Sequence, residues 1–207
     1  MIGRLARASR GVAMLEFAIA LPVFLVMSLT GAELTNYITV RMRLSQVALQ
    51  LADNAARMGT GGQLILKTIS EADINDLFIG AELQSDEMHL GDHGRVILSS
   101  VEEDPDHPGK YKIGWQRCYG TRTSHPSTYG TYNTASGRDM TGMGPDGQKI
   151  TAPTGGATMF VEVYYEYQPI VDRRLAPSIA MTEIASMMVR DTRDLTQIRN
   201  DAAASNC

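Results

Sequence analysis

Reactive and metal-binding side chains are scarce in this chain of 207 residues. It has 2 cysteines, 4 histidines and 1 tryptophan, and its formal net charge of -4 leaves no basic excess for a nucleic-acid surface. The sequence lacks a Gly-x-Ser-x-Gly nucleophile elbow, a phosphate-binding glycine loop and a zinc-binding helix. We therefore predict neither an enzyme nor a nucleic-acid-binding protein, and we expect no cofactor.

Long apolar runs are also lacking, except for one near the N-terminus. From residue 12 to residue 32 the only polar side chains are Glu16, Ser28 and Thr30. At a rise of about 1.5 Å per residue, a helix of this length crosses a hydrocarbon core roughly 30 Å thick. We predict one transmembrane helix over 12–32.

The segment before this helix carries three basic residues and no acidic one: Arg4, Arg7 and Arg10. The positive-inside rule leaves such a leader in the cytoplasm and sends the chain beyond Ala32 across the membrane. Pro22 lies inside the span, where it removes a backbone hydrogen bond and would kink an ordinary helix.

One carboxylate, Glu16, interrupts the span. An acidic side chain in the centre of a membrane helix costs about 2.5 to 3.5 kcal/mol, so it usually marks a paired, functional position. Gly11 precedes Glu16 with four residues between them, and Phe17 follows. This spacing, together with Pro22, resembles the processing site and stem of type IV pilin precursors. The resemblance implies cleavage after Gly11 by a prepilin peptidase, which leaves Val12 as the mature N-terminus.

The same resemblance implies a partner for Glu16. In a pilin-like filament Glu16 would pair with the free amino terminus of a neighbouring subunit, which offsets the burial of two charges and sets the axial register. The alternatives are a carboxylate that snorkels to the membrane edge and a protonated one.

A secretory signal peptide is a second interpretation of the N-terminus, with Thr30-Gly31-Ala32 as its cleavage site. Cleavage there would release a soluble protein that begins at Glu33. A glutamate and a proline inside so long an apolar segment disfavour it. The mature N-terminus distinguishes the two interpretations.

A second helical pattern follows the span. Apolar side chains recur at spacings of three and four and form a stripe: Tyr37, Val40, Leu44, Val47, Leu51, Ala55 and Met58. We predict an amphipathic helix over 33–58 that ends before Gly59, because glycine readily supplies a C-cap. The stripe is expected to pack against the downstream domain; the alternative is an independent partner-binding helix or coiled coil.

A weaker helical pattern covers 64–78. Within it Asp73, Asn75 and Asp76 resemble calcium ligands, but a calcium loop also needs a glycine turn and a final bidentate carboxylate. We interpret them as the polar face of a helix. His89 and His93 would suggest zinc only if they lay on a helix, and the glycines beside them indicate a loop. We predict no metal site.

The second half of the chain favours strands. Residues 95–101, 110–118 and 159–167 are rich in valine, isoleucine and aromatic side chains, and a turn-forming segment joins the first two into an expected antiparallel hairpin. The alternation in 160–167 predicts one face against the helical stripe and one against water.

Glycine, threonine, serine and proline dominate 119–156, which predicts a long loop. Such loops are uncommon in compact domains unless they bind something or are disordered. The tyrosines Tyr119, Tyr129 and Tyr132 suggest adhesion, and disorder is the alternative.

Both ends of the chain resemble a narrower family. The start at 16–18 with Pro22, the strand 161–169 and the late segment 185–190 together resemble the TadE/TadF group of minor pilins, or pseudopilins, of the tight adherence (Tad/Flp) secretion system. The resemblance implies a minor pilin that contributes to pilus assembly, priming or surface adhesion. The alternatives are a membrane-anchored or secreted adhesive domain outside any filament, and an extracytoplasmic hydrolase built from dispersed residues.

The chain has an even number of cysteines, Cys118 and Cys207, and both lie in the expected extracytoplasmic domain, where disulfides persist. They either join in a disulfide or remain free thiols. The resemblance to pilins with C-terminal disulfides favours the bond.

The fold expected is α+β, with a long N-terminal helix packed on a small antiparallel sheet. Its parts are a leader at 1–11, the transmembrane helix at 12–32, the amphipathic extension at 33–58 and an extracytoplasmic domain at 59–207. We expect the protein to span the bacterial inner membrane once, with its N-terminus in the cytoplasm and its C-terminal domain in the periplasm. The surface pilus is a further expected location. The expected partners are the prepilin peptidase, other pilins of the same system, the inner-membrane assembly platform and membrane lipid.

Overall fold

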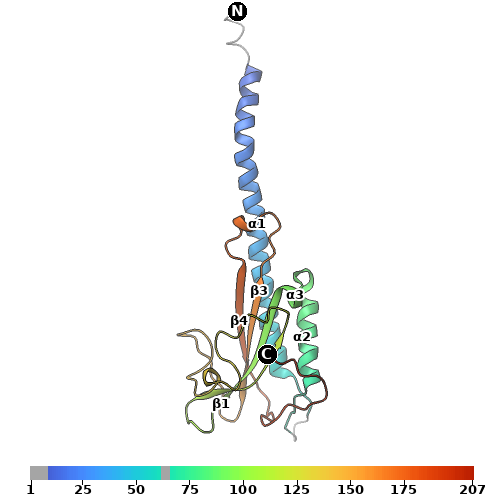
Figure 1. The fold of residues 1–207 in the computed structure, drawn as a ribbon, viewed down its shortest axis with the longest axis vertical. Helices are drawn as coiled ribbons and strands as arrows, with labels where there is room; N and C mark the ends of the chain where they lie inside the picture. The colour runs from blue at the N-terminus through green and yellow to red at the C-terminus, as the bar shows by residue number, and fades with distance from the viewer. Residues whose placement is uncertain (1–8, 62–65) are drawn as a thin grey trace, which may run out of the picture. The chain divides into compact units, whose positions relative to one another are not determined.

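The computed structural model describes residues 9–61 and 66–207, so most of the expected leader lies outside the described residues. The fold is α+β, as predicted: a long apolar N-terminal helix precedes a four-stranded antiparallel sheet (Figure 1). The chain divides into two compact units. The first contains the described residues up to Thr39 together with Gln168–Ile179, and the second contains Val40–Tyr167 together with Ala180–Cys207.

Helix α1 spans Ser9–Arg57 and continues through Pro22. Its last turn is closed by a hydrogen bond of 2.9 Å from the backbone N–H of Met58 to the carbonyl oxygen of Asn54. Gly59 follows with φ at 106°, a conformation that glycine adopts without strain. The prediction that this helix ends before Gly59 is confirmed.

A distant arginine caps the carbonyl groups at the end of α1. The guanidinium of Arg193 donates hydrogen bonds to the carbonyl oxygens of Ala55, Ala56 and Met58, at 3.3, 3.1 and 2.8 Å. These oxygens have few partners within the helix itself, and a cation near a helix C-terminus is also favoured by the helix dipole.

The middle of the predicted apolar stripe is buried in the second unit, whereas Tyr37, Val40 and Met58 at its ends are half-buried. Leu44, Val47, Leu51 and Ala55 are each at most 3% exposed. Three alanines that the stripe did not include, Ala48, Ala52 and Ala56, are buried beside them. Small side chains let the helix approach its neighbours closely, so the packed face is wider than the stripe of large residues indicated.

The helix expected over 64–78 is wrong in its bounds. Helix α2 spans Glu71–Ser85, and 62–65 lie outside the described residues. Ser70 begins the helix because its hydroxyl accepts a hydrogen bond from the N–H of Asp73, whose carboxylate accepts one from the N–H of Ser70. This capping box fixes the start. Asp73 is thus a capping residue.

The loop expected around His89 and His93 is partly wrong. After the short helix η2, Asp86–Met88, the chain forms α3, Leu90–His93, a helix of 4 residues. His89 precedes it in the left-handed region, at φ 47°. Among the described residues, no group of three or more histidine, cysteine, aspartate or glutamate side chains is arranged to hold a metal ion.

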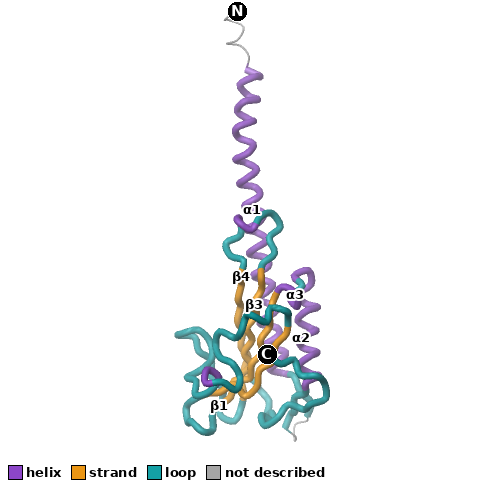
Figure 2. The backbone as a smooth tube through the Cα atoms, viewed as in Figure 1, coloured by secondary structure: helices purple, strands orange, loops and turns teal. Residues whose placement is uncertain are grey.

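The sheet contains strands β1 (Gly94–Glu103), β2 (Tyr111–Tyr119), β3 (Ala157–Glu166) and β4 (Ala180–Met188), in the order β2-β1-β3-β4. Figure 2 shows the strands in orange beside the helices in purple. The predicted hairpin of β1 and β2 is confirmed, with Ile97 opposite Cys118. β3 pairs antiparallel with β1, and β4 completes the far edge.

The prediction that one face of β3 meets water is wrong, because both faces are covered. On one face Val161 and Val163 of β3 are fully buried, and on the same face of the sheet β2 contacts α2 through a stack of Tyr119 on Phe78. On the other face Phe160 is 2% exposed and packs with Met143 of the long loop. The loop therefore replaces solvent over this face.

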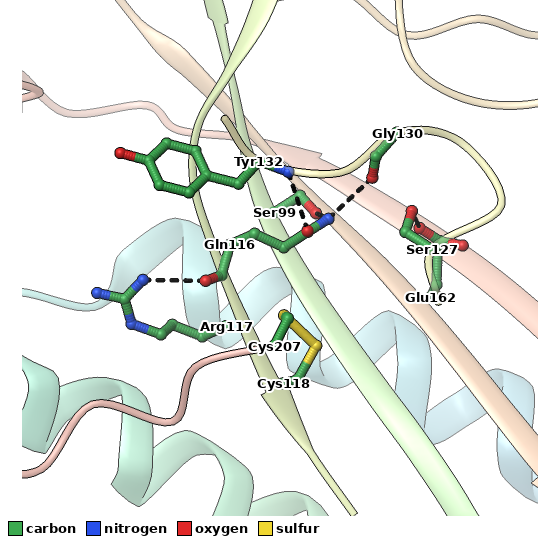
Figure 3. Close-up of a disulfide and its surroundings, with 9 residues drawn as sticks. All are labelled: Ser99, Gln116, Arg117, Cys118, Ser127, Gly130, Tyr132, Glu162 and Cys207. Carbon is green, nitrogen blue, oxygen red and sulfur yellow. Dashed lines mark hydrogen bonds between the residues drawn. A yellow bond between two sulfur atoms is a disulfide. The ribbon is translucent and has the colours of Figure 1, made fainter. Parts of the chain in front are cut away.

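The loop between β2 and β3 is folded onto the sheet, which excludes the alternative of disorder. Gln116 of β2 donates a hydrogen bond to the carbonyl oxygen of Gly130 at 3.1 Å and accepts one from the N–H of Tyr132 at 3.2 Å (Figure 3). Glu162, in the middle of β3, accepts hydrogen bonds from the Ser127 hydroxyl and from the N–H of Thr128, the latter at 3.0 Å. Buried polar side chains of the sheet thus hold the loop.

Candidate processing and assembly site

Gly11 and Val12 lie in the first turns of α1. A Cβ atom added at Gly11 would have no neighbour within 4 Å, and Val12 is 57% exposed. Packing within the described residues therefore gives no reason for glycine at position 11.

Glu16 lies at the N-terminal end of an apolar helix face. Ile19, Ala20, Val23 and Met27 follow it at helical spacing and line the same shallow groove. Among the described residues no ion pair or hydrogen bond involves the carboxylate of Glu16.

Phe17 and the rest of the apolar segment are exposed. The described residues contain one helix long and apolar enough to cross a membrane, over Gly11–Arg57. Its most apolar window has a mean hydropathy of 2.3, and none of that window is buried. Phe17 itself is 65% exposed. Lipid or other protein chains could cover such a surface, and signal sequences share the same length and composition.

The sequence did not identify the role of Glu33, which is fully buried. Its carboxylate accepts a hydrogen bond of 2.7 Å from the N–H of Val171, in the connection between β3 and β4. A signal was available, because Glu33 precedes Tyr37 by four residues and so falls on the stripe that becomes buried. An acidic residue at such a position predicts a hydrogen-bonded carboxylate.

Cys118 and Cys207 are joined by a disulfide in the structure, with Cα atoms 4.9 Å apart (Figure 3). The N–H of Cys118 also donates a hydrogen bond of 2.8 Å to the carbonyl oxygen of Ser205. The C-terminal segment therefore meets the outer edge of β2 at this point.

A cavity of about 880 Å³ lies where the turn between β1 and β2 meets the long loop. Its wall includes Tyr132 and two acidic residues, Glu102 and Asp104. Glu102 is 6% exposed, accepts a hydrogen bond of 2.8 Å from the hydroxyl of Ser100, and occupies the space beside Gly114, where a side chain would collide with it. Burial raises the pKa of Glu102. The sequence predicted nothing of this cavity, because its walls come from distant segments.

The N-terminal part of the chain matches a known protein family. Residues 11–60 match the family model described as TadE-like protein. This match covers α1 from Gly11 onward and confirms, for that segment, the resemblance to TadE-like pilins seen in the sequence. Comparisons with curated proteins and with solved structures gave no match. The TadE-like segment indicates a Tad pilus-associated protein with one helix that could serve as its membrane anchor.

Proposed function

We propose that this protein is a minor pilin, or pseudopilin, of a Tad-type pilus and contributes to pilus assembly, priming or surface adhesion. The observation that carries the proposal is an exposed apolar segment over 12–32 whose one carboxylate, Glu16, follows Gly11 at the pilin spacing. The match to the TadE-like family begins at the same glycine.

In the proposed pathway the leader at 1–11 stays in the cytoplasm and the helix over 12–32 crosses the inner membrane. A prepilin peptidase cleaves after Gly11, and Val12 becomes the new amino terminus. The helix then leaves the lipid together with the helices of other pilins, at the assembly platform. The lone carboxylate of Glu16 pairs with the amino terminus of a neighbouring subunit, which makes the transfer into an apolar filament core less costly.

The processing step is tested by Gly11→Leu, with Gly31→Leu as a matched control. Both glycines lie in α1, and a Cβ added at either would have no neighbour within 4 Å. Intact mass measurement should show the native protein and Gly31→Leu beginning at Val12, and Gly11→Leu retaining the leader. Removal of the leader from Gly11→Leu, or a native protein that begins at Glu33, would contradict the proposal.

A second candidate function is adhesion by the folded domain while it stays anchored in the membrane. The cavity beside Tyr132, which is 46% exposed, favours it. Cells carrying Gly11→Leu distinguish the two functions: full surface adhesion with an uncleaved leader supports the anchored domain, whereas loss of adhesion supports the processed pilin.

A further inference from the structure

Arg95, at the start of β1, is a buried cation that has no hydrogen-bond or ion-pair partner among the described residues. It is 6% exposed, and its Nε atom is enclosed without a hydrogen bond. Two other arginines differ: the half-buried Arg117 contacts the carboxylate of Glu71, and the buried Arg193 donates to helix carbonyl oxygens. Among the described residues no ion pair involves Arg95. Burial of an uncompensated guanidinium is costly, so this position requires another explanation.

A second arginine is brought to the same end of the sheet by a tight loop. Gly120 has φ at 101°, and a Cβ atom there would lie 2.4 Å from the carbonyl oxygen of Gly94. The chain can therefore cross directly over the start of β1, where the N–H of Arg122 donates to the carbonyl oxygen of Gly94 at 3.3 Å. One Nη atom of Arg122 lies 3.0 Å from Glu166, but its Nε atom is buried without a partner.

An imidazole lies near Arg95. Tyr164 is the register partner of Arg95 in β3, and the ring of His125 stacks on Tyr164 with centroids 3.9 Å apart. Burial and the positive charge of Arg95 both lower the pKa of His125. The lowered pKa favours the neutral imidazole, which can still donate one N–H.

The cluster contains more positive charge and more N–H donors than its own residues use. Arg95 and Arg122 carry two positive charges, whereas the carboxylate of Glu166 contacts Arg122 alone of the two. A guanidinium presents its donors in a planar fork that matches the oxygens of a phosphate group. We propose that Arg95, Arg122 and His125 bind a phosphate group. The proposal does not depend on the function proposed above.

The test uses the full chain in a phosphate-free maltoside detergent. Thermal unfolding is followed with sodium phosphate or sodium chloride at equal ionic strength and pH. Phosphate should raise the unfolding midpoint of the native protein, because a ligand that binds the folded state stabilises it. Arg95→Met should bind phosphate about tenfold more weakly or worse, since it removes charge-assisted hydrogen bonds.

The order of stability of the native protein and Arg95→Met, measured with and without phosphate, distinguishes a binding site from an arginine with only a structural role. Without phosphate, Arg95→Met should be at least as stable as the native protein, because it removes an uncompensated buried charge. With saturating phosphate the native protein should be the more stable of the two. Arg138→Met is the matched control, because it removes an exposed arginine from the same unit and should leave the phosphate response unchanged.

Two further measurements complete the test. Arg122→Met should weaken the response independently, which keeps the test valid if Arg95→Met does not fold. Micelles doped with phosphatidylglycerol distinguish the source of the group: an Arg95-dependent rise with this lipid alone assigns a lipid headgroup, and a rise with inorganic phosphate assigns a soluble ligand. If neither probe stabilises the native protein more than the arginine variants, or if Arg138→Met loses the response equally, the proposal is wrong.

Discussion

The carboxylate of Glu33 in α1 holds the backbone of Val171, 138 residues later in the chain, through a hydrogen bond of 2.7 Å. This contact ties the connection between β3 and β4 to the helix within the first compact unit. Glu33 is fully buried, whereas Val171 is 39% exposed, so water can replace only part of what this contact contributes if the carboxylate is removed.

Glu33→Ala should therefore loosen the connection 168–179. The expected cost is about 0.5 to 1.5 kcal/mol, the usual net contribution of one hydrogen bond. Hydrogen exchange of the Val171 amide should be faster in this variant, whereas Glu33→Gln keeps an acceptor oxygen and should exchange nearly as slowly as the native protein. Equal protection of Val171 in the alanine variant would show that the contact does not hold the segment.

Glu16→Val should leave membrane insertion intact or slightly improved, because removal of a carboxylate from an apolar helix favours transfer into lipid. Assembly should fail instead, since the neighbouring amino terminus loses its partner. Membrane fractionation measures the first effect and the yield of sheared pili the second. Native levels of pili in cells that carry only this variant would eliminate the proposed pairing.

Cys207→Ser should destabilise the second unit. The disulfide closes a loop across a sequence separation of 89, and the chain-entropy model assigns such a loop at most about 4 to 5 kcal/mol. Protease sensitivity of the domain should increase while removal of the leader continues. Thiol labelling of the folded, unreduced native protein provides the control, because reaction of both cysteines would show that the bond is missing.

Glu102 gives the stability a pH dependence of known sign. Burial raises its pKa in the folded state, so the native protein holds this proton more tightly than the unfolded chain does. The free energy of unfolding then falls as pH rises from the ordinary glutamate range through the raised native pKa, and stays reduced above it.

Glu102→Gln removes this titration and keeps an acceptor for the hydroxyl of Ser100. The variant should gain stability relative to the native protein as pH rises from about 4 to 7, which denaturant unfolding at several pH values can measure. Parallel pH profiles for the two proteins would mean that Glu102 does not titrate in this range.

Local patterns in the sequence predicted the elements that depend on neighbouring residues. The spacing of Leu44, Val47 and Leu51 indicated the buried helix face, and Gly59 indicated where the helix ends. The alternation of side chains in 160–167 also predicted strand β3, but it could not show that a loop covers the second face of this strand. That cover depends on Met143 and Phe160, which meet only after the chain has folded.

The same limit applies to the sites. The glycine, the carboxylate and their spacing near the N-terminus are local, so the sequence could point to Gly11 and Glu16. The proposed phosphate-binding site could not be predicted, because Arg95, Arg122 and His125 belong to a strand and a loop that only the tertiary fold brings together. Glu33 was predictable in part, from its position on the helical stripe.

The arginine cap on α1 relates the fold to the order in which the chain is made. Arg193 follows Met58 by 135 residues, and β4 pairs with β3 only from Ala180 onward. On the proposed export route, the first helix is in the membrane long before either partner reaches the periplasm. Until then the carbonyl groups at the end of α1 lack their hydrogen bonds from Arg193, and β3 is an edge strand without β4 beside it. This state favours chaperone binding and proteolysis. A chain interrupted before Ala180 would never leave that state, so folding of the domain acts as a check that export has delivered its C-terminal segment.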